Sequence, residues 1–194
     1  MCFVASMCLC VFVVKSNVQP TLPIVNTSER NASKAELMKK VRCELCACVQ
    51  PARTYHCDLC GVCVHKRDHH SIWLDTCIGS KNQKYFMGAL VALLFCCFYS
   101  SNLTLTTICH PTLMGGLLLI PDDCSDVFGD IHIAICFVSS VYTLMIAALG
   151  IFLLFQQLWL VTHNTTYQEW QQGQMGLYSK GCFRNLVEFF CGTS

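Results

Sequence analysis

Two long runs without Asp, Glu, Lys or Arg dominate the pattern along this chain, at residues 86–108 and 131–161. The first run has 23 residues and the second has 31. A hydrocarbon core of about 30 Å is crossed by about 20 helical residues, so both runs predict transmembrane helices, the second with room for tilt. Two helices buried in a soluble core are the alternative, but such lengths without a charge argue against it.

The first 42 residues divide into an apolar and a polar part. Residues 1–14 carry no charge but are too short to span a bilayer, and no basic segment precedes them as in a signal peptide. We interpret them as the cytosolic end of a membrane helix that begins outside this chain; an interfacial segment is the alternative. Residues 15–42 are a polar linker, in which 28–42 can form a short helix.

Composition and charge placement strengthen the membrane interpretation. Charged residues make up 13% of the chain, against about 25% in an average soluble domain. All 13 Lys and Arg lie within 15–84 or 180–184, whereas the segment 109–130 holds four aspartates and no basic residue. The positive-inside rule therefore places 15–84 and the tail after 162 in the cytosol, and 109–130 in the lumen. In a lumenal loop Cys109 and Cys124 can form a disulfide, although nothing in the sequence requires one.

Cysteine and histidine crowd the segment 43–85, which has too few large aliphatic residues for a core. In a reducing cytosol, cysteines at short regular spacing indicate metal binding rather than disulfides. Six cysteines and two histidines suffice for two tetrahedral zinc sites, each with three thiolates and one imidazole. These eight are Cys43, Cys46, His56, Cys57, Cys60, Cys63, His70 and Cys77. Cys48 is left over, no internal repeat is apparent, and spacing alone does not divide the ligands between the two ions. Each site carries one excess negative charge, which Arg42, Arg53, Lys66 and Arg67 can offset.

The order of these residues matches a known family. The pattern C-x2-C-x9-H-C-x2-C-x2-C-x4-D-H-H-S-x5-C-x4-N-x3-F runs from Cys43 through Asn82 to Phe86. It resembles the cysteine-rich domain of the DHHC protein S-acyltransferases, also called palmitoyltransferases. Every spacing matches, and the departure is Ser71, which stands where the family has the cysteine of its name.

The resemblance continues beyond the cysteine-rich segment. Thr165 and Thr166 begin "TTYQ", which is similar to the family's T-T-x-E, with Gln168 where glutamate is usual. Asn185 matches the asparagine of the family's C-terminal segment, where residues at helical spacing predict a short helix on the membrane surface. Family members usually have at least four membrane helices, with this domain between the second and third, so the chain resembles a short form or a fragment.

The resemblance implies an α-helical integral membrane protein with a small cytosolic two-zinc cysteine-rich domain. We expect seven segments: a partial membrane helix (1–14), a cytosolic linker (15–42), the zinc domain (43–85), a membrane helix (86–108), a lumenal loop (109–130), a membrane helix (131–161) and a cytosolic C-terminal segment (162–194). The resemblance also implies that the ligands of the two zinc sites interleave along the chain. Cys43, Cys46, His56 and Cys63 would bind one structural Zn²⁺, and Cys57, Cys60, His70 and Cys77 the other.

By the same resemblance, residues 68–71 form the catalytic group. Ser71 stands where the family's cysteine accepts the acyl chain from palmitoyl-CoA, with His69 as its base and Asp68 as the group that orients His69. A pair that only supports zinc is the alternative role for Asp68 and His69. A serine hydroxyl is harder to activate than a thiol, and its oxygen ester is reluctant to pass the chain to another thiol. We therefore expect weak or absent turnover.

Three functions follow from these residues. The first is protein S-palmitoyltransfer to cysteines of membrane-associated proteins, weakened by Ser71. The second is an inactive zinc-containing membrane scaffold that binds substrates or active paralogues, and the third is a zinc-stabilised interaction module unrelated to acyl transfer. The expected partners are the lipid bilayer, acyl-CoA and protein substrates, with no nucleic acid, and the expected location is the endoplasmic reticulum or Golgi membrane.

Overall fold

The computed structural model describes residues 41–114 and 118–192, which form two compact units. The first unit contains the described residues up to Gly88 and those from Gln157 onward, and the second unit is Ala89–Gln156. The segment expected at 1–14 and nearly all of the expected linker lie outside the described residues. Val41 and Arg42 belong to a strand, so the short helix expected at 28–42 does not extend to its predicted end.

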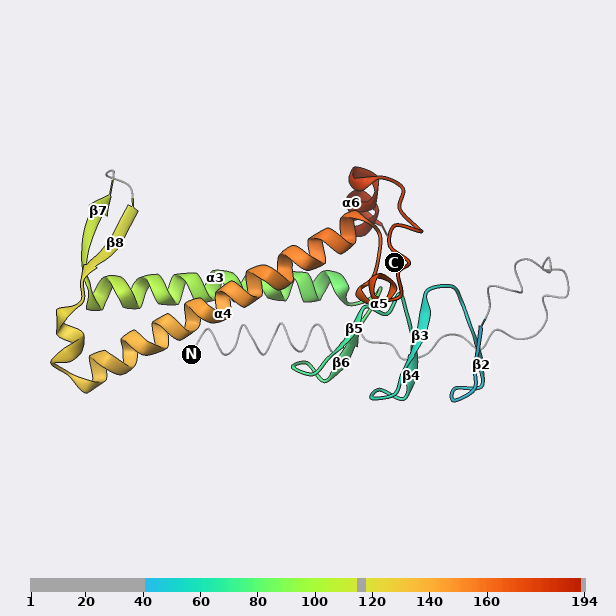
Figure 1. The fold of residues 1–194 in the computed structure, drawn as a ribbon, viewed down its shortest axis with the longest axis horizontal. Coiled ribbons are helices and arrows are strands. Elements are labelled where there is room, and N and C mark those ends of the chain that lie inside the picture. Colours follow the sequence, from blue (N-terminus) through green and yellow to red (C-terminus); the bar gives the residue numbers. More distant parts are fainter. Residues whose placement is uncertain (1–40, 115–117, 193–194) are drawn as a thin grey trace, which may run out of the picture. The chain divides into compact units, whose positions relative to one another are not determined.

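Three short antiparallel hairpins follow one another in the first unit (Figure 1). They are hairpin 1 from β1 (Val41–Cys43) and β2 (Cys48–Gln50), hairpin 2 from β3 (Thr54–Cys57) and β4 (Val62–His65), and hairpin 3 from β5 (His69–Ser71) and β6 (Thr76–Ile78). An isolated two-stranded hairpin is marginally stable in water. The fully or nearly buried apolar side chains here are those of Cys43, Cys57, Cys63, Cys77 and Ile78. Because four of these five are cysteines, hydrophobic burial alone does not hold the hairpins together.

Two further helices in the first unit follow the long helix α4 (Ile131–Thr162) along the chain. Helix α5 (Tyr167–Gln171) begins with a capping box, in which Thr166 accepts from the backbone N–H of Glu169 and the Glu169 carboxylate accepts from that of Thr166. Helix α6 (Cys182–Cys191) carries a buried Asn185, whose Nδ2 donates to the carbonyl oxygen of Thr162 at 2.7 Å. The predicted C-terminal helix therefore exists, and it is attached to the last residue of α4.

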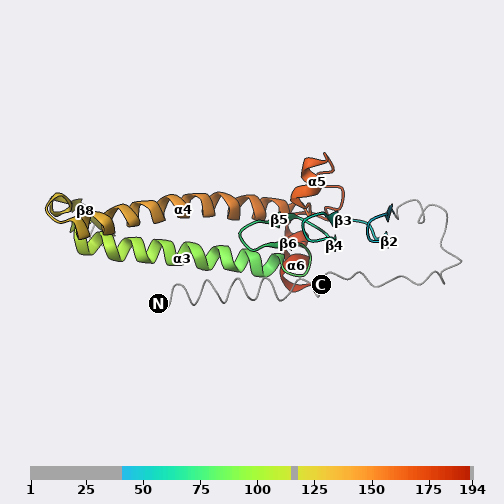
Figure 2. The same ribbon diagram turned by 90° about the horizontal axis from the view of Figure 1, so that it is seen from below.

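The second unit contains most of α3 (Gln83–Ile108) and α4, which cross obliquely in Figure 1 and lie side by side in Figure 2. The hydroxyl of Ser101 donates to the carbonyl oxygen of Ser140 at 3.2 Å, and a Cβ at Gly150 would meet Leu94 at 3.0 Å, so the two helices approach closely. Among the described residues, these two helices are long and apolar enough to cross a membrane. Helix α3 begins at Gln83, slightly before the predicted start at 86.

The segment between these helices has more structure than a plain loop. It contains hairpin β7 (His110–Met114) and β8 (Leu118–Asp123), followed by a 3₁₀ turn at Ser125–Phe128. A disulfide joins Cys109 to Cys124 at the base of this hairpin. The pairing that the sequence allowed is therefore present.

Candidate functional site

Four side chains from hairpins 1 and 2 form a group that we call cluster 1. Its members are Cys43, Cys46, His56 and Cys63, and their ligand atoms all lie within 4.8 Å of one another. The three sulfurs lie 3.6, 3.2 and 3.8 Å from Nδ1 of His56. Around a tetrahedral zinc ion, bonds of about 2.3 Å to sulfur and 2.0 Å to nitrogen place those atoms about 3.5 Å apart. The geometry of cluster 1 therefore fits a zinc ion.

Cluster 2 repeats this arrangement. Cys57, Cys60 and Cys77 lie 3.7, 3.2 and 3.8 Å from Nδ1 of His70. Each member of cluster 2 lies 14 positions after its counterpart in cluster 1. The chain thus contains an internal repeat that the sequence analysis missed, because the copies interleave: the histidine of the first directly precedes the first cysteine of the second.

Hairpin 2 supplies ligands to both clusters. Its strands pair His56 with Cys63, and both belong to cluster 1. Cys57 at the end of β3 and Cys60 in the following turn belong to cluster 2. The two strands of hairpin 3 in turn pair a histidine with a cysteine for cluster 2. A metal ion in each cluster would therefore bind neighbouring hairpins together.

The backbone follows the same 14-residue period as the ligands. Ala47, Gly61 and Asp75 occupy equivalent positions in the three hairpin turns, and all three have positive φ values of 53°, 67° and 49°. The left-handed region is unfavourable for most L-residues and free for glycine. Each turn therefore has a left-handed backbone at the same position, although only Gly61 is of the residue type that adopts it without strain.

The protonation of these thiols depends on a cation. Burial raises the pKa of the Cys63 thiol to about 12 and that of the Cys77 thiol to about 12. Without a metal ion these thiols stay protonated at neutral pH, so a divalent cation must displace their protons.

Of the four basic residues expected to offset the negative charge, Arg67 lies against cluster 2, with Nη2 3.8 Å from Sγ of Cys57. Its Nη1 donates to the side-chain oxygen of Gln168.

Strand β5 separates the tasks of two adjacent histidines. Successive side chains on a strand point to opposite faces, so His69 and Ser71 share one face and His70 takes the other, toward cluster 2. Nδ1 of His69 donates to Oδ2 of Asp68 at 2.8 Å. The ring of Phe86 packs edge-on against His69, with ring centroids 5.4 Å apart.

The Asp68 carboxylate is held by groups from outside the hairpin. Only 1% of Asp68 is exposed. Its Oδ1 accepts from the backbone N–H of Tyr167 at 2.5 Å, and its Oδ2 accepts from Nε2 of Gln157 at 2.8 Å. Ser71 is buried, and in the described part of the chain its hydroxyl makes no hydrogen bond to His69. The carboxylate and imidazole are thus paired, and among the described residues no hydrogen bond connects the Ser71 hydroxyl to this pair.

Comparisons with known proteins agree with this geometry. The family model for the DHHC palmitoyltransferases matches residues 36–174. The chain belongs to this family. It is 31% identical over 167 residues to mouse palmitoyltransferase ZDHHC23, which covers 78% of this chain and 39% of the relative. It is 33% identical over 146 residues to human palmitoyltransferase ZDHHC23, which covers 75% of this chain and 35% of the relative.

A zebrafish relative gives a similar match. Palmitoyltransferase ZDHHC15A of Danio rerio is 36% identical over 130 residues, which covers 66% of this chain and 36% of the relative. The chain therefore spans roughly two-fifths of the length of the curated relatives that it matches. The residues that the family model matches include both clusters and the two long apolar helices of this chain.

The motif residues of this DHHC-family chain connect its elements. Asn82 is buried at the start of α3, where its Nδ2 donates to the carbonyl oxygen of Cys77 at 2.9 Å and its Oδ1 accepts from the N–H of Gly79. Thr165 and Thr166 are buried, and the cap that Thr166 makes aims the next backbone N–H at Asp68. These motif residues therefore hold Asp68 and the strand that carries Cys77 of cluster 2.

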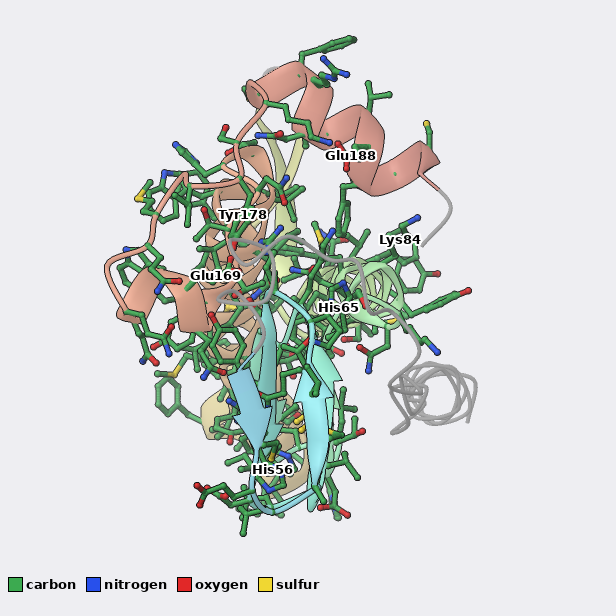
Figure 3. All side chains as sticks on the ribbon, turned by 90° about the vertical axis from the view of Figure 1, so that its right-hand side faces the viewer. His56, His65, Lys84, Glu169, Tyr178 and Glu188 are labelled. Atoms are coloured by element: carbon green, nitrogen blue, oxygen red, sulfur yellow. A yellow bond between two sulfur atoms is a disulfide. The ribbon has the colours of Figure 1, made fainter. Side chains whose placement is uncertain are left out.

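Sequence reasoning missed one buried ion pair. Glu169 is fully buried and accepts twice from Arg53, at 2.6 and 2.8 Å. Arg53 also donates to the side-chain oxygen of Asn164 and lies over the ring of Tyr178, 4.4 Å from its centroid. Figure 3 shows Glu169 and Tyr178 at the opposite end of the hairpins from His56. Arg53 thus neutralises a carboxylate and not a metal cluster. The T-x-x-E pattern of a capping box at 166–169 was the signal that could have found Glu169.

Proposed function

We propose that the intact protein is a protein S-palmitoyltransferase that moves a long acyl chain from acyl-CoA to cysteines of membrane-associated proteins. We also propose that Ser71 leaves the present form with weak or no turnover. One observation carries the first proposal: the imidazole of His69 is oriented by Asp68 on the same face of β5 as residue 71. A base oriented by a carboxylate beside a nucleophile position is the arrangement that acyl transfer needs.

The proposed reaction has two steps when residue 71 is a cysteine. Nε2 of His69 accepts the thiol proton, the sulfur attacks the thioester carbonyl of acyl-CoA, and the CoA thiol leaves with a proton. A thiolate of the protein substrate then attacks the enzyme thioester and releases the sulfur of residue 71. With Ser71 the first product is an oxygen ester, whose transfer to a thiol is uphill. The acyl group would therefore stay on Ser71 as an oxygen ester, and the reaction would stop after its first step.

The two clusters are proposed to hold structural zinc. Each supplies three thiolates and one imidazole, a set that suits Zn²⁺ and completes a tetrahedral shell. A closed shell has no position for substrate, so the metals would hold the hairpins and take no part in acyl transfer. The residues of each cluster are those that the family resemblance assigned to it.

We place residues 15–84 and 162–194 in the cytosol, 109–130 in the lumen, and the two apolar runs in an endoplasmic reticulum or Golgi membrane. The distribution of basic residues supports this arrangement. The disulfide between Cys109 and Cys124 supports it independently, since disulfides form in the lumen and not in the reducing cytosol. Exposed side chains such as Phe95 and Phe155 are suited to contact with lipid.

Ser71 itself favours a second function, that of a non-catalytic scaffold which still binds acyl-CoA, substrates or active paralogues. An acyl-exchange assay on the purified protein separates the two functions. The Ser71 form should bind palmitoyl-CoA without forming a hydroxylamine-labile acyl product, and Ser71→Cys should form a thioester at residue 71. His69→Ala in the Ser71→Cys background is the control and should lose the thioester. Robust transfer to a protein thiol by the Ser71 form would contradict the proposal, and no thioester in Ser71→Cys with zinc intact would favour the scaffold.

A further inference from the structure

A buried glutamine on α4 contacts the catalytic carboxylate, although no motif of the sequence includes it. Gln157 is 5% exposed, and its Nε2 donates to Oδ2 of Asp68 at 2.8 Å. The same carboxylate oxygen accepts from Nδ1 of His69. Gln157 and Asp68 are 89 positions apart in the sequence and belong to the same compact unit.

A second glutamine extends this contact, whose direction is set by the carboxylate of Asp68, because a carboxylate only accepts. Gln83, the first residue of α3, is buried, and its Nε2 donates to Oε1 of Gln157 at 3.1 Å. If the amide of Gln157 were turned around, its oxygen would face the oxygen of Asp68 and its nitrogen would face the nitrogen of Gln83. Both contacts would then be repulsive. The chain of hydrogen bonds therefore runs in one direction, from Gln83 through Gln157 to Asp68.

We infer that Gln157 is a positioning residue that fixes the Asp68 carboxylate and, through it, the orientation and tautomer of His69. This inference rests on the proposed acyl transfer. The three donors to Asp68 come from β5, from α4 and from the start of α5. Because a carboxylate held from three sides cannot rotate, its Oδ2 stays aimed at Nδ1 of His69. The proton then stays on Nδ1, which leaves Nε2 as the free base on the face shared with residue 71.

Loss of the amide should free the carboxylate without removing the hairpin. Gln157→Met keeps nearly the same volume and removes both hydrogen bonds, while the backbone N–H of Tyr167 still holds Oδ1. Gln156→Met is the matched control, because Gln156 is the adjacent residue of the same helix and has no hydrogen bond to Asp68 among the described residues. Zinc content should remain at two ions per chain in both variants if the hairpins stay folded.

The first measurement uses the protein with Ser71 and needs no turnover. Side-chain ¹⁵N NMR of histidine-labelled protein should show His69 as a single tautomer with its proton on Nδ1. In Gln157→Met the spectrum should show a mixture of both tautomers, and in Gln156→Met it should be unchanged. A His69 spectrum that Gln157→Met leaves unchanged would overturn the inference.

The second measurement uses the Ser71→Cys background and follows thioester formation with palmitoyl-CoA. Gln157→Met should lower the maximal rate about ten-fold or more, since a misdirected base costs that much. The palmitoyl-CoA concentration at half-maximal rate should change by less than about two-fold, because the residue does not bind substrate. An equal loss in Gln156→Met, or an effect confined to that concentration, would overturn the inference. If Ser71→Cys forms no thioester, the proposed function fails for this chain, and the NMR result alone decides the role of Gln157.

Discussion

Cluster 1 and cluster 2 have the same ligand order and nearly the same geometry, but only cluster 2 has a ligand on the strand that carries His69 and Ser71. The three sulfur–nitrogen distances are 3.6, 3.2 and 3.8 Å in cluster 1 and 3.7, 3.2 and 3.8 Å in cluster 2. In cluster 2, His70 directly follows His69, and the carbonyl of Cys77 is held by Asn82 at the start of α3. A metal ion in cluster 2 would therefore set the position of β5, the strand of the proposed catalytic group.

Cluster 1 has different neighbours. Gln50 donates through Nε2 to Sγ of Cys63 at 3.1 Å, and the spare thiol of Cys48 lies 3.9 Å from the same sulfur. In the 14-residue repeat the counterparts of Cys48 and Gln50 are Val62 and Val64. Ligand spacing thus determines the geometry of each cluster, whereas the residues around it determine its role. Three experiments test this contrast and one tests the attachment of the hairpins to the C-terminal segment, from the largest expected effect to the smallest.

The largest contrast is between adjacent histidines. His70→Ala removes one of the four ligands of cluster 2 and should lose one of two zinc ions. Because a structural zinc contributes about 10 kcal/mol or more to folding, the hairpins should also lose stability. The variant should also abolish thioester formation in the Ser71→Cys background. His56→Ala should also lose one zinc but keep part of that activity, because cluster 1 does not hold β5. Elemental analysis and the acyl-exchange assay measure both effects. His69→Ala is the control and should keep two zinc ions; equal zinc loss from His69→Ala and His70→Ala would show that the two residues have been misassigned.

The second contrast concerns what attaches the hairpin region to the C-terminal segment. Glu169→Gln should destabilise the protein by about 3 kcal/mol, because Arg53 would remain as a buried cation without its carboxylate. Lys180→Met is the matched control at the exposed pair with Glu188 and should cost less than about 1 kcal/mol. Thermal unfolding of the two variants gives the comparison. Similar losses of stability in the two variants would mean that the buried pair has no special structural role.

The third contrast is in acid stability. Although burial opposes it, the backbone N–H of Cys60 and the nearby Arg67 bring the pKa of the Cys57 thiol down to about 6. In cluster 1 the backbone N–H of Cys46 lowers the pKa of the equivalent Cys43 thiol as well, so the difference between the clusters is the Arg67 charge beside Cys57. That charge keeps Cys57 ionised to lower pH, so protons should displace zinc from cluster 2 at lower pH than from cluster 1. Zinc release to a chelator between pH 7 and pH 5 should therefore occur in two steps, with cluster 1 first. Arg67→Met should bring the two steps together, and a single step in the unmodified protein would refute the difference.

The smallest expected effect is oxidation at cluster 1. Hydrogen peroxide should join the zinc-bound thiolate of Cys63 and the thiol of Cys48 in a disulfide, taking two electrons from the sulfurs and the Cys48 proton and being reduced to water and hydroxide, with release of one zinc ion. Mass spectrometry of the digested protein identifies the linked peptides. Cys48→Val copies the residue at the equivalent position of the repeat and should keep both zinc ions under the same treatment. Equal release from Cys48→Val would show that the spare thiol is not responsible.

The sequence by itself determined the features that depend on local spacing or length. Eight ligands within 35 residues predicted two metal sites, because two-residue spacers let one turn present two thiolates to one ion. Uncharged runs longer than 20 residues predicted two helices whose observed bounds differ by three residues or fewer. The family pattern also named Asp68, His69 and residue 71, since these are neighbours along the chain.

Only the tertiary structure decided the contacts between distant segments. Spacing alone did not divide the eight ligands between two ions. The fold shows the division, in which hairpin 2 supplies ligands to both clusters. Arg53 reaches Glu169 across 116 positions, and Gln157 reaches Asp68 across 89. No local pattern predicts such pairs, because buried polar side chains are satisfied by whatever donors and acceptors the fold brings within reach.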